Sequence, residues 1–354
     1  MESSTLAKPG TKKWGAPRRQ EVDLSAGLVK VGRLAPGSPL PVLVEPEVAG
    51  VDLITWAAQN RALLDRWLHA EGGVLFRGFQ LDAIADFERL IAAVSGELLR
   101  YSYRSTPRSE VEGRIYTSTE YPPHQSIPLH NEMSYSRAWP MKIWFYCQTA
   151  APAGGETPIA DSRRVWAALP VDLRRRFVAR GVMYVRNYGR GLDLAWQEVF
   201  NTTDRGEVAA FCRAAGIDFT WQGEDGLSTR QVCQAAARHP ATGELVWFNQ
   251  AHLFHVSGLD AAVRRSLVED FTEAGLPRNA CFGDGAPIPD SDLDAIRAVL
   301  DAATVVFPWR PGDLLLLDNM LTAHARRPFS GPRKILVGMA EEGSGYGIGA
   351  GDLA

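Results

Sequence analysis

The chain has 354 residues, of which 45% are hydrophobic and 22% are charged, a balance typical of a globular protein with one large domain or two ordinary ones. Its 38 basic and 41 acidic side chains give a formal net charge of −3, so no basic excess predicts binding to nucleic acid or to an anionic membrane. The four cysteines are widely spaced and form no CxxC pair, which excludes a zinc ribbon and a disulfide scaffold as simple interpretations and favours reduced thiols.

The N-terminal segment is polar, and residues 1–20 are predicted to form a flexible tail because they offer little to bury. Its basic residues are not followed by the apolar run of a signal peptide. No stretch approaches the roughly 20 apolar residues of a membrane-spanning helix. Because no repeat or linker divides the rest, residues 21–354 are predicted to form a single domain, and we expect a cytoplasmic protein.

The first half of the chain alternates helical periodicity with short apolar runs. A Pro-rich segment over 31–48 predicts extended, irregular backbone, and Gly72-Gly73 is expected to end the first helix. Residues 101–128 are polar and lack periodicity, which predicts a long binding loop. The predicted helices here are 52–69, 81–94 and 163–179, and the predicted strands are 74–79, 143–148 and a short one that ends at Asp161.

The second half is again a mixture, with strands that carry no βαβ rhythm. Ser228 is a plausible N-cap for one helix, and Asp290 or Ser291 for another. The predicted helices are 207–215, 227–237, 260–274 and 292–300, and the predicted strands are 181–186, 245–248, 305–307, 313–318 and 334–339. The pattern predicts a mainly β fold with α insertions, built as an antiparallel sheet pair or barrel.

One short stretch, Leu129-His-Asn-Glu-Met-Ser-Tyr135, places an imidazole and a carboxylate two residues apart, at His130 and Glu132. If the stretch is extended, both side chains point to the same face, because strand side chains alternate. A His-x-Glu pair arises by chance in many chains, so it predicts a metal site only with a third ligand from elsewhere.

Six other histidines could supply that ligand. His324 is the best placed, since it follows the apolar strand over 313–318 and one further turn at the edge of the expected core. His252 and His255 remain possible in a loop. The others are His69, predicted at the surface, His239, predicted to be exposed in a turn, and His124 in the polar loop.

Two histidines and one carboxylate form the facial triad of non-haem Fe(II) oxygenases, which leaves coordination positions open. A dicarboxylic cosubstrate also needs a cation at its far end, and Arg333 follows His324 at the start of the next strand. Arg326 is a second basic residue nearby, for which a surface position or a structural salt bridge is an equal alternative. Zinc in the same triad would give a hydrolase, but that chemistry has no need of Arg333.

Four motifs follow one another between Gly73 and Met339. They are Gly73-Val-Leu-Phe-Arg-Gly-Phe79, Leu129-His-Asn-Glu-Met-Ser-Tyr135, Gly154-Gly-Glu-Thr-Pro158, and Asp318-Asn…His324-Ala-Arg-Arg-Pro-Phe…Gly331-Pro-Arg333. This ordered set resembles the taurine dioxygenase/TfdA family of Fe(II)- and 2-oxoglutarate-dependent oxygenases, in particular its SyrP-like branch. The resemblance implies a double-stranded β-helix (jelly roll) of the clavaminate synthase type, flanked by helices.

The resemblance also implies roles for individual residues. His130, Glu132 and His324 would bind Fe(II), Thr157 would donate its hydroxyl to a 2-oxoglutarate carboxylate, and Arg333 would pair with the distal carboxylate. Many members of the family carry Asp where this chain has Glu132, whereas related halogenases carry a small residue. A carboxylate at this position therefore favours hydroxylation or desaturation over halogenation.

The implied reaction couples oxidative decarboxylation of 2-oxoglutarate with dioxygen to hydroxylation of a C–H bond. The resemblance suggests an amino acid, free or tethered to a carrier protein, as the small-molecule substrate in natural-product biosynthesis. Desaturation or cyclisation at the same iron is an alternative, and so is a non-catalytic jelly-roll module, which should have lost its ligands. A homo-oligomer is possible. Predicted substrate contacts are Arg104, Ser118, Asn131, Tyr135 and Asn249.

Overall fold

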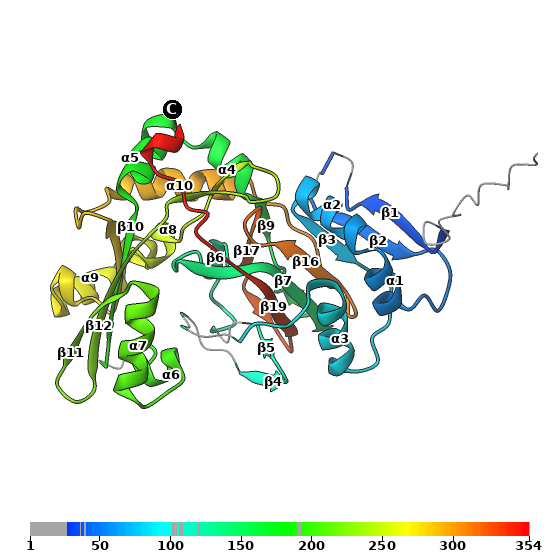
Figure 1. Cartoon of the computed structure of the whole chain (residues 1–354), viewed down its shortest axis with the longest axis horizontal. Helices are drawn as coiled ribbons and strands as arrows, with labels where there is room; N and C mark the ends of the chain where they lie inside the picture. Colours follow the sequence, from blue (N-terminus) through cyan, green and yellow to red (C-terminus); the bar gives the residue numbers. More distant parts are fainter. Residues whose placement is uncertain are drawn as a thin grey trace, which may run out of the picture.

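The structure, a computed structural model, describes the chain from residue 27 to residue 353 except for a few short gaps (Figure 1). The described residues are 27–35, 37, 38, 40–100, 103, 105, 109–118, 121–189 and 193–353. The predicted tail over residues 1–20 lies outside them, and so does Arg104. Within the described ranges, none of the helices combines the length and the apolar composition that a membrane span requires.

An eight-stranded sheet forms the centre of the molecule (Figure 1). In spatial order its strands are β1 (Val29–Arg33), β2 (Val42–Pro46), β3 (Gly73–Phe76), β16 (Leu314–Asp318), β7 (Ala138–Thr149), β19 (Lys334–Ser344), β5 (Ile115–Thr117) and β4 (Glu110–Glu112). All pairs are antiparallel except β2 with β3. The predicted strands 143–148, 313–318 and 334–339 therefore form, and the Pro-rich segment predicted as irregular contains β1 and β2.

The run of four leucines in β16 explains why this strand is central. Leu314 and Leu316 pack on one face of the sheet, whereas Leu315 and Leu317 pack on the other, and all four are fully buried. An apolar residue on both faces is stable only where both faces are covered, and burial of each leucine contributes about 1.5–3 kcal/mol.

A smaller sheet packs against one face of the central sheet. Its strands are β6 (Ile127–His130), β17 (Thr322–Arg326) and β9 (Ile159–Asp161). Ile159 shares a hydrophobic cluster with Leu315 and Leu317, which joins the two sheets. A separate two-stranded ribbon pairs β18 (Phe329–Ser330) with β8 (Ala153–Gly154). The sheet pair with its helical insertions confirms the predicted jelly-roll class.

Three helices cover the other face of the central sheet: α1 (Leu53–Gln59), α2 (Arg61–Glu71) and α3 (Ile84–Ser95) (Figure 1). The single helix predicted over 52–69 is wrong, because Asn60 adopts a non-helical conformation and its side chain donates to the carbonyl of Trp56. Gly72 ends α2 in the left-handed region at φ 82°, as the Gly-Gly pair predicted.

A separate four-stranded sheet forms a lobe on the side opposite those helices (Figure 1). Its strands are β11 (Asp218–Gln222), β12 (Gly226–Cys233), β10 (Val182–Tyr188) and β15 (Arg278–Phe282). The helix predicted over 227–237, with Ser228 as its N-cap, is wrong. Burial alternates along β12, with Leu227, Thr229 and Gln231 inside, so the segment has the period of a strand.

The remaining elements connect these sheets. They are the helices α4 (Ser162–Ala168), α5 (Val171–Arg180), α6 (Trp196–Phe200), α7 (Arg205–Ala215), α8 (Ala251–Phe254), α9 (Ala261–Asp270) and α10 (Asp290–Ala302), the hairpin β13 (Ala236–Arg238) and β14 (Leu245–Trp247), and 3₁₀ turns at Val256–Gly258, Glu273–Gly275 and Ala350–Leu353. Pro170 splits the helix predicted over 163–179. Pro289 takes the N-cap position of α10 that was predicted for Asp290 or Ser291. The strand predicted over 305–307 is reduced to one bridge between Val305 and Ile159.

Candidate functional site

Three side chains that are far apart in sequence converge where β6 and β17 meet. One ligand atom from each of His130, Glu132 and His324 lies within 4.8 Å of the others. His324 Nε2 lies 3.8 Å from Glu132 Oε2, and the two imidazole centroids are 4.4 Å apart. Glu132 and His324 are 2% and 4% exposed. Two imidazoles and one carboxylate at this spacing could hold a divalent metal ion.

The pairing of two strands explains why the histidines meet. His324 follows β16 and a turn over 319–321, as predicted, and it lies within β17, directly opposite His130 on β6. Opposite residues on antiparallel strands are neighbours whose side chains lie on the same face. The sequence signal for β17 is weak, because Thr-Ala-His-Ala-Arg has no run of branched or aromatic residues.

Glu132 reaches the cluster by a turn rather than along a strand, so the predicted extended geometry is wrong. β6 ends at His130, and residues 132–135 form turns in which Met133 has a positive φ of 57°. A side chain longer than aspartate by one methylene reaches the histidines from this turn.

A backbone carbonyl sets the tautomer of His130. Its Nδ1 lies 2.8 Å from the carbonyl oxygen of Pro128. A carbonyl only accepts, so Nδ1 carries the proton and Nε2 keeps its lone pair. A neutral imidazole fixed in one tautomer by a backbone carbonyl is the form in which histidine binds a metal.

Asn319 holds the backbone of Glu132 from both sides. Its Oδ1 accepts from the N–H of Glu132 at 2.7 Å, and its Nδ2 donates to the carbonyl of Glu132 at 2.9 Å and to that of Pro140 at 2.8 Å. Asn319 is fully buried. This side chain thereby fixes the turn that carries the carboxylate. The sequence offered one signal for it, since a polar Asp-Asn pair directly follows the apolar run of β16.

Three further side chains hold the neighbouring backbone. Asn131 Nδ2 donates to the Ser162 hydroxyl at 3.0 Å and to the carbonyl of Asn319 at 2.7 Å. Gln250 Nε2 donates to the carbonyl of Asn131 at 2.7 Å. His252 Nε2 donates to the carbonyl of Leu129 at 2.8 Å, and burial lowers the pKa of His252 to about 4, so the ring is neutral near pH 7.

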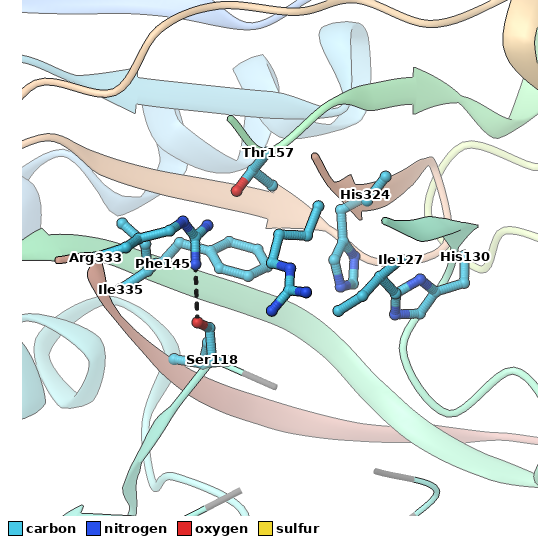
Figure 2. Close-up of a pocket in the computed structure, with 11 residues that line it drawn as sticks. Ser118, Ile127, His130, Phe145, Thr157, His324, Arg333 and Ile335 are labelled. Carbon is cyan, nitrogen blue, oxygen red and sulfur yellow. Dashed lines mark hydrogen bonds between the residues drawn. The ribbon is translucent and has the colours of Figure 1, made fainter. Parts of the chain in front are cut away.

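A pocket opens beside the histidines (Figure 2). Its lining residues are Ser118, Ile127, His130, Phe145, Thr157, His324, Ala325, Arg326, Arg333, Ile335 and Val337. Figure 2 shows His130 and His324 at one end of the pocket and Arg333 at the other, with Thr157 on the wall between them. The lining residues include two arginines, Arg326 and Arg333, and no carboxylate. The pocket is therefore suited to an anion.

Arg333 reaches the pocket by passing close to the backbone of Gly155. Its Nε donates to the carbonyl of Gly155 at 2.8 Å and its Nη1 to the Ser118 hydroxyl at 3.1 Å. Burial, together with the charge of Arg326, lowers the pKa of Arg333 to about 10. A Cβ on Gly155 would lie 2.9 Å from Cδ of Arg333, and Gly155 has φ +74°, so the close approach requires glycine.

Arg326 and Thr157 complete the polar part of the pocket. Arg326 is 6% exposed and donates to the carbonyls of Tyr121, Pro122 and Gln125 at 2.8–2.9 Å. It therefore ties a loop segment to the pocket and is not a surface residue. Thr157 accepts a hydrogen bond from the indole N–H of Trp309 at 3.0 Å, which leaves its hydroxyl proton to donate elsewhere.

The residues predicted to contact substrate have other partners in the structure. Ser118 lies in the pocket and bonds to Arg333. Asn131 uses its amide within the protein, as described above. The Tyr135 hydroxyl donates to the carbonyl of Tyr103 at 2.9 Å. Asn249 Nδ2 donates to the carbonyl of Ala235, and its Oδ1 accepts from the N–H of Ala251.

A second cluster of ligand-type side chains joins His69, His239 and Asp318. His239 is 1% exposed, so its predicted exposure is wrong. Its Nδ1 accepts from the N–H groups of Ala241 and Thr242, which leaves Nε2 to donate to Asp318 Oδ2 at 3.0 Å. Because both ring nitrogens are committed to hydrogen bonds, this cluster is a structural brace rather than a metal site.

Sequence comparison relates this chain to one protein family and to two known relatives. The family model "Taurine catabolism dioxygenase TauD, TfdA family" matches residues 35–340. Dapdiamide synthesis protein DdaC of Enterobacter agglomerans is 39% identical over 309 residues, which cover 84% of this chain and 94% of the relative. A clavaminate synthase-like protein of Arabidopsis thaliana is 32% identical over 327 residues, 86% of this chain and 94% of the relative.

A likeness at the level of fold extends to solved structures. The crystal structure of PvcB from Pseudomonas aeruginosa superposes with a TM-score of 0.53 at 14% identity, over 92% of this chain and 94% of that chain. At this identity the likeness concerns the fold alone, and it matches the sheet pair described above.

Proposed function

This chain belongs to the taurine catabolism dioxygenase TauD, TfdA family of non-haem Fe(II)- and 2-oxoglutarate-dependent dioxygenases, and on that premise we propose that it hydroxylates an unactivated C–H bond of an amino acid or aminoacyl substrate. Fe(II), 2-oxoglutarate and dioxygen are the cofactor and cosubstrates, and the substrate is a small molecule. The observation that carries the proposal is the convergence of two imidazoles and a carboxylate beside a pocket with a cation at its far end.

We assign the Fe(II) ligands to His130, Glu132 and His324. The donor set fits this metal, since imidazole and carboxylate suit Fe(II) and the ligand cluster found among the described residues contains no cysteine that would favour zinc. When bound, iron with 2-oxoglutarate supplies the oxidising chemistry, and the protein supplies ligand geometry and substrate orientation.

We assign the 2-oxoglutarate site to the pocket of Figure 2. The guanidinium of Arg333 would pair with the distal carboxylate, since a charge-assisted hydrogen bond from a buried arginine is the strong form of that contact. The Thr157 hydroxyl would donate to a carboxylate oxygen. The bond from Ser118 to Arg333 supports a role for Ser118 in orienting this guanidinium rather than in contacting substrate.

The side-chain hydrogen bonds to the backbone around Glu132 suggest positioning roles for Asn319 and Asn131. Asn319 would set the place of Glu132, and Asn131 would support it through its hydrogen bond to the carbonyl of Asn319 rather than by touching substrate. A role in natural-product biosynthesis is supported by the 39% identity to a dapdiamide synthesis protein. The retained ligand set argues against a non-catalytic jelly-roll module.

The experiment that tests this function has two stages. Anaerobic addition of Fe(II) and then 2-oxoglutarate to the purified chain should give a weak visible charge-transfer band. His324→Ala should lose the band while it keeps the fold. The matched variant His255→Ala, which alters a buried histidine outside the metal set, should keep the band. A well-folded, metal-loaded wild type without the band would overturn the assignment.

The second stage identifies the reaction. Free and carrier-loaded amino acids are screened for substrate-dependent release of succinate, and the products are weighed by mass spectrometry. A product heavier by one oxygen atom supports hydroxylation. A product lighter by two hydrogen atoms would replace hydroxylation by desaturation.

A further inference from the structure

The lobe contains a buried guanidinium that forms no ion pair with any residue the structure describes. Arg186 on β10 is 1% exposed, and none of its three side-chain nitrogens makes a hydrogen bond. Among the described residues it is the one charged side chain with all its nitrogens in this state. A buried charge without a hydrogen-bonding partner is expensive, and a native protein that keeps one usually has a reason, such as a ligand.

The groups around Arg186 are also missing partners. Thr229 lies directly opposite it on β12, and Tyr188 lies two residues along the same face of β10. The Tyr188 hydroxyl, the Thr229 hydroxyl and Gln231 Oε1 are all buried without a well-aligned hydrogen bond, although the Thr229 hydroxyl lies close enough to Tyr188 and Tyr103 to offset part of the rise in their pKa that burial causes. Within the part of the chain that the structure describes, four neighbouring polar groups on one face of two paired strands therefore keep unused hydrogen-bonding capacity, and three of them are hydrogen-bond donors.

The contacts that Arg186 does make are with aromatic rings. Its guanidinium carbon lies 4.9 Å from the ring centroid of Tyr188 and 5.6 Å from that of Tyr103. The carboxylate of Asp193 is near enough for its charge to act on Arg186, but Asp193 forms its ion pair with Arg278. The cation is thus held by weak ring contacts, worth about 0.5–2 kcal/mol each, in place of an acceptor.

A series of contacts connects this cluster to the turn over 132–135 that carries Glu132. Tyr135, three residues after Glu132, donates its hydroxyl proton to the carbonyl of Tyr103. The ring of Tyr135 also contacts that of Tyr184, which precedes Arg186 by two residues on the same face of β10. The cluster therefore lies next to the element that carries Glu132, on the side of the lobe.

We propose that Arg186, with the hydroxyls of Tyr188 and Thr229, binds a carboxylate of the substrate. The proposal rests on the proposed function, since it concerns the substrate of the same iron site. The planar fork of an arginine matches the two oxygens of a carboxylate, and two hydroxyls can donate to the same group. Gln231 Oε1 is an acceptor beside them, suited to an ammonium group.

The chemistry of this site distinguishes between the two substrate forms. A free amino acid carries a carboxylate, whereas an amino acid tethered to a carrier through a thioester has lost that charge. Arg186 therefore favours a substrate with a free carboxylate. Because the guanidinium is enclosed, entry of the carboxylate must displace the tyrosine rings that cover it.

The test uses acetate as a minimal carboxylate, with acetamide as its neutral match and chloride as a simple anion. The full chain is saturated anaerobically with Fe(II) and 2-oxoglutarate, so that Arg333 is occupied. Acetate, but neither acetamide nor chloride, should raise the Tm of the wild type and perturb the charge-transfer band. Arg186→Met should weaken the response by at least about tenfold, which corresponds to loss of one charge-assisted contact.

Two further variants and one measurement complete the design. Thr229→Val, close to isosteric, should weaken the acetate response, and Arg213→Met, which removes an exposed arginine near the ring of Phe219, should leave it unchanged. The Tm of ligand-free Arg186→Met should not fall, because the substitution removes an uncompensated buried charge. A lower Tm would make Arg186 a structural residue and overturn the proposal.

The outcomes distinguish failure of the carboxylate site from failure of the proposed iron site. A wild type that responds equally to acetate and chloride, or an acetate response unchanged in Arg186→Met, overturns the carboxylate site while the charge-transfer band still supports the iron site. Absence of the band from the wild type overturns the proposed function itself.

Discussion

Asn319→Asp tests how much the hydrogen bonds between Asn319 and the backbone of Glu132 contribute to stability and to metal binding. The substitution keeps Oδ1, which accepts from the N–H of Glu132 at 2.7 Å. It replaces the amide NH₂, which donates to the carbonyls of Glu132 and Pro140, by an oxygen that cannot donate when ionised. The shape is unchanged, so the loss of two donated hydrogen bonds is the main perturbation.

The expected loss of stability follows from those two bonds. A buried acceptor that loses its donor costs about 1–3 kcal/mol, so two cost about 2–6 kcal/mol in the free energy of unfolding. Since the carbonyl of Glu132 is one of them, the turn that carries its carboxylate should also loosen. We expect Fe(II) binding to weaken by roughly 10–100-fold, the usual effect of losing a residue that orients a metal ligand.

Asn187→Asp is the matched control. The amide of Asn187 donates to two backbone carbonyls as well, those of Ala274 at 3.0 Å and Leu276 at 2.7 Å, but it lies in the lobe. Both variants are compared by chemical denaturation and by anaerobic Fe(II) titration. If Asn319→Asp loses as much stability as Asn187→Asp and binds Fe(II) as the wild type does, Asn319 has no positioning role and the reasoning is refuted.

Three other predictions concern the pocket and the metal segment. Arg333→Lys should raise the KM for 2-oxoglutarate by roughly 10–100-fold, because an ammonium cannot form the forked contact; an unchanged KM in a succinate assay would remove Arg333 from the site. Gly155→Ala should also weaken 2-oxoglutarate binding, measured by titration of the charge-transfer band, since its Cβ would lie 2.9 Å from Arg333 Cδ and the positive φ costs about 1–2 kcal/mol; wild-type affinity would contradict this. Burial lowers the pKa of His252 from 6.5 to about 4, so the unfolded state binds this proton more readily and stability should fall by about 3 kcal/mol as the pH drops from 6.5 towards 4. His252→Gln should flatten that pH dependence in denaturant titrations, and an equally steep profile would refute the assignment.

Elements could be predicted correctly from the sequence where one short-range pattern dominated. The apolar run of β16, the helical periodicity of α3 and the glycine that ends α2 each follow from short-range pattern. The predictions were wrong where two sequence patterns favour different structures. Residues 227–237 contain helix-forming residues, but burial alternates over 227–233 as in a strand. Asn60 and Pro170 break stretches whose periodicity continues across them.

The sequence by itself determined the chemical types at the site: two imidazoles, a carboxylate, a threonine and an arginine, in an order that resembles one family. Tertiary structure decided how they meet. β6 and β17 set His130 opposite His324, and Asn319 grips Glu132 across a separation of 187 residues. Periodicity within one segment contains no information on which distant segment will lie beside it, because strand register depends on the packing of the whole sheet pair. The unpartnered Arg186 belongs to the same category, since in sequence it is one arginine among many, and only burial on the inner face of the lobe makes its missing acceptor visible.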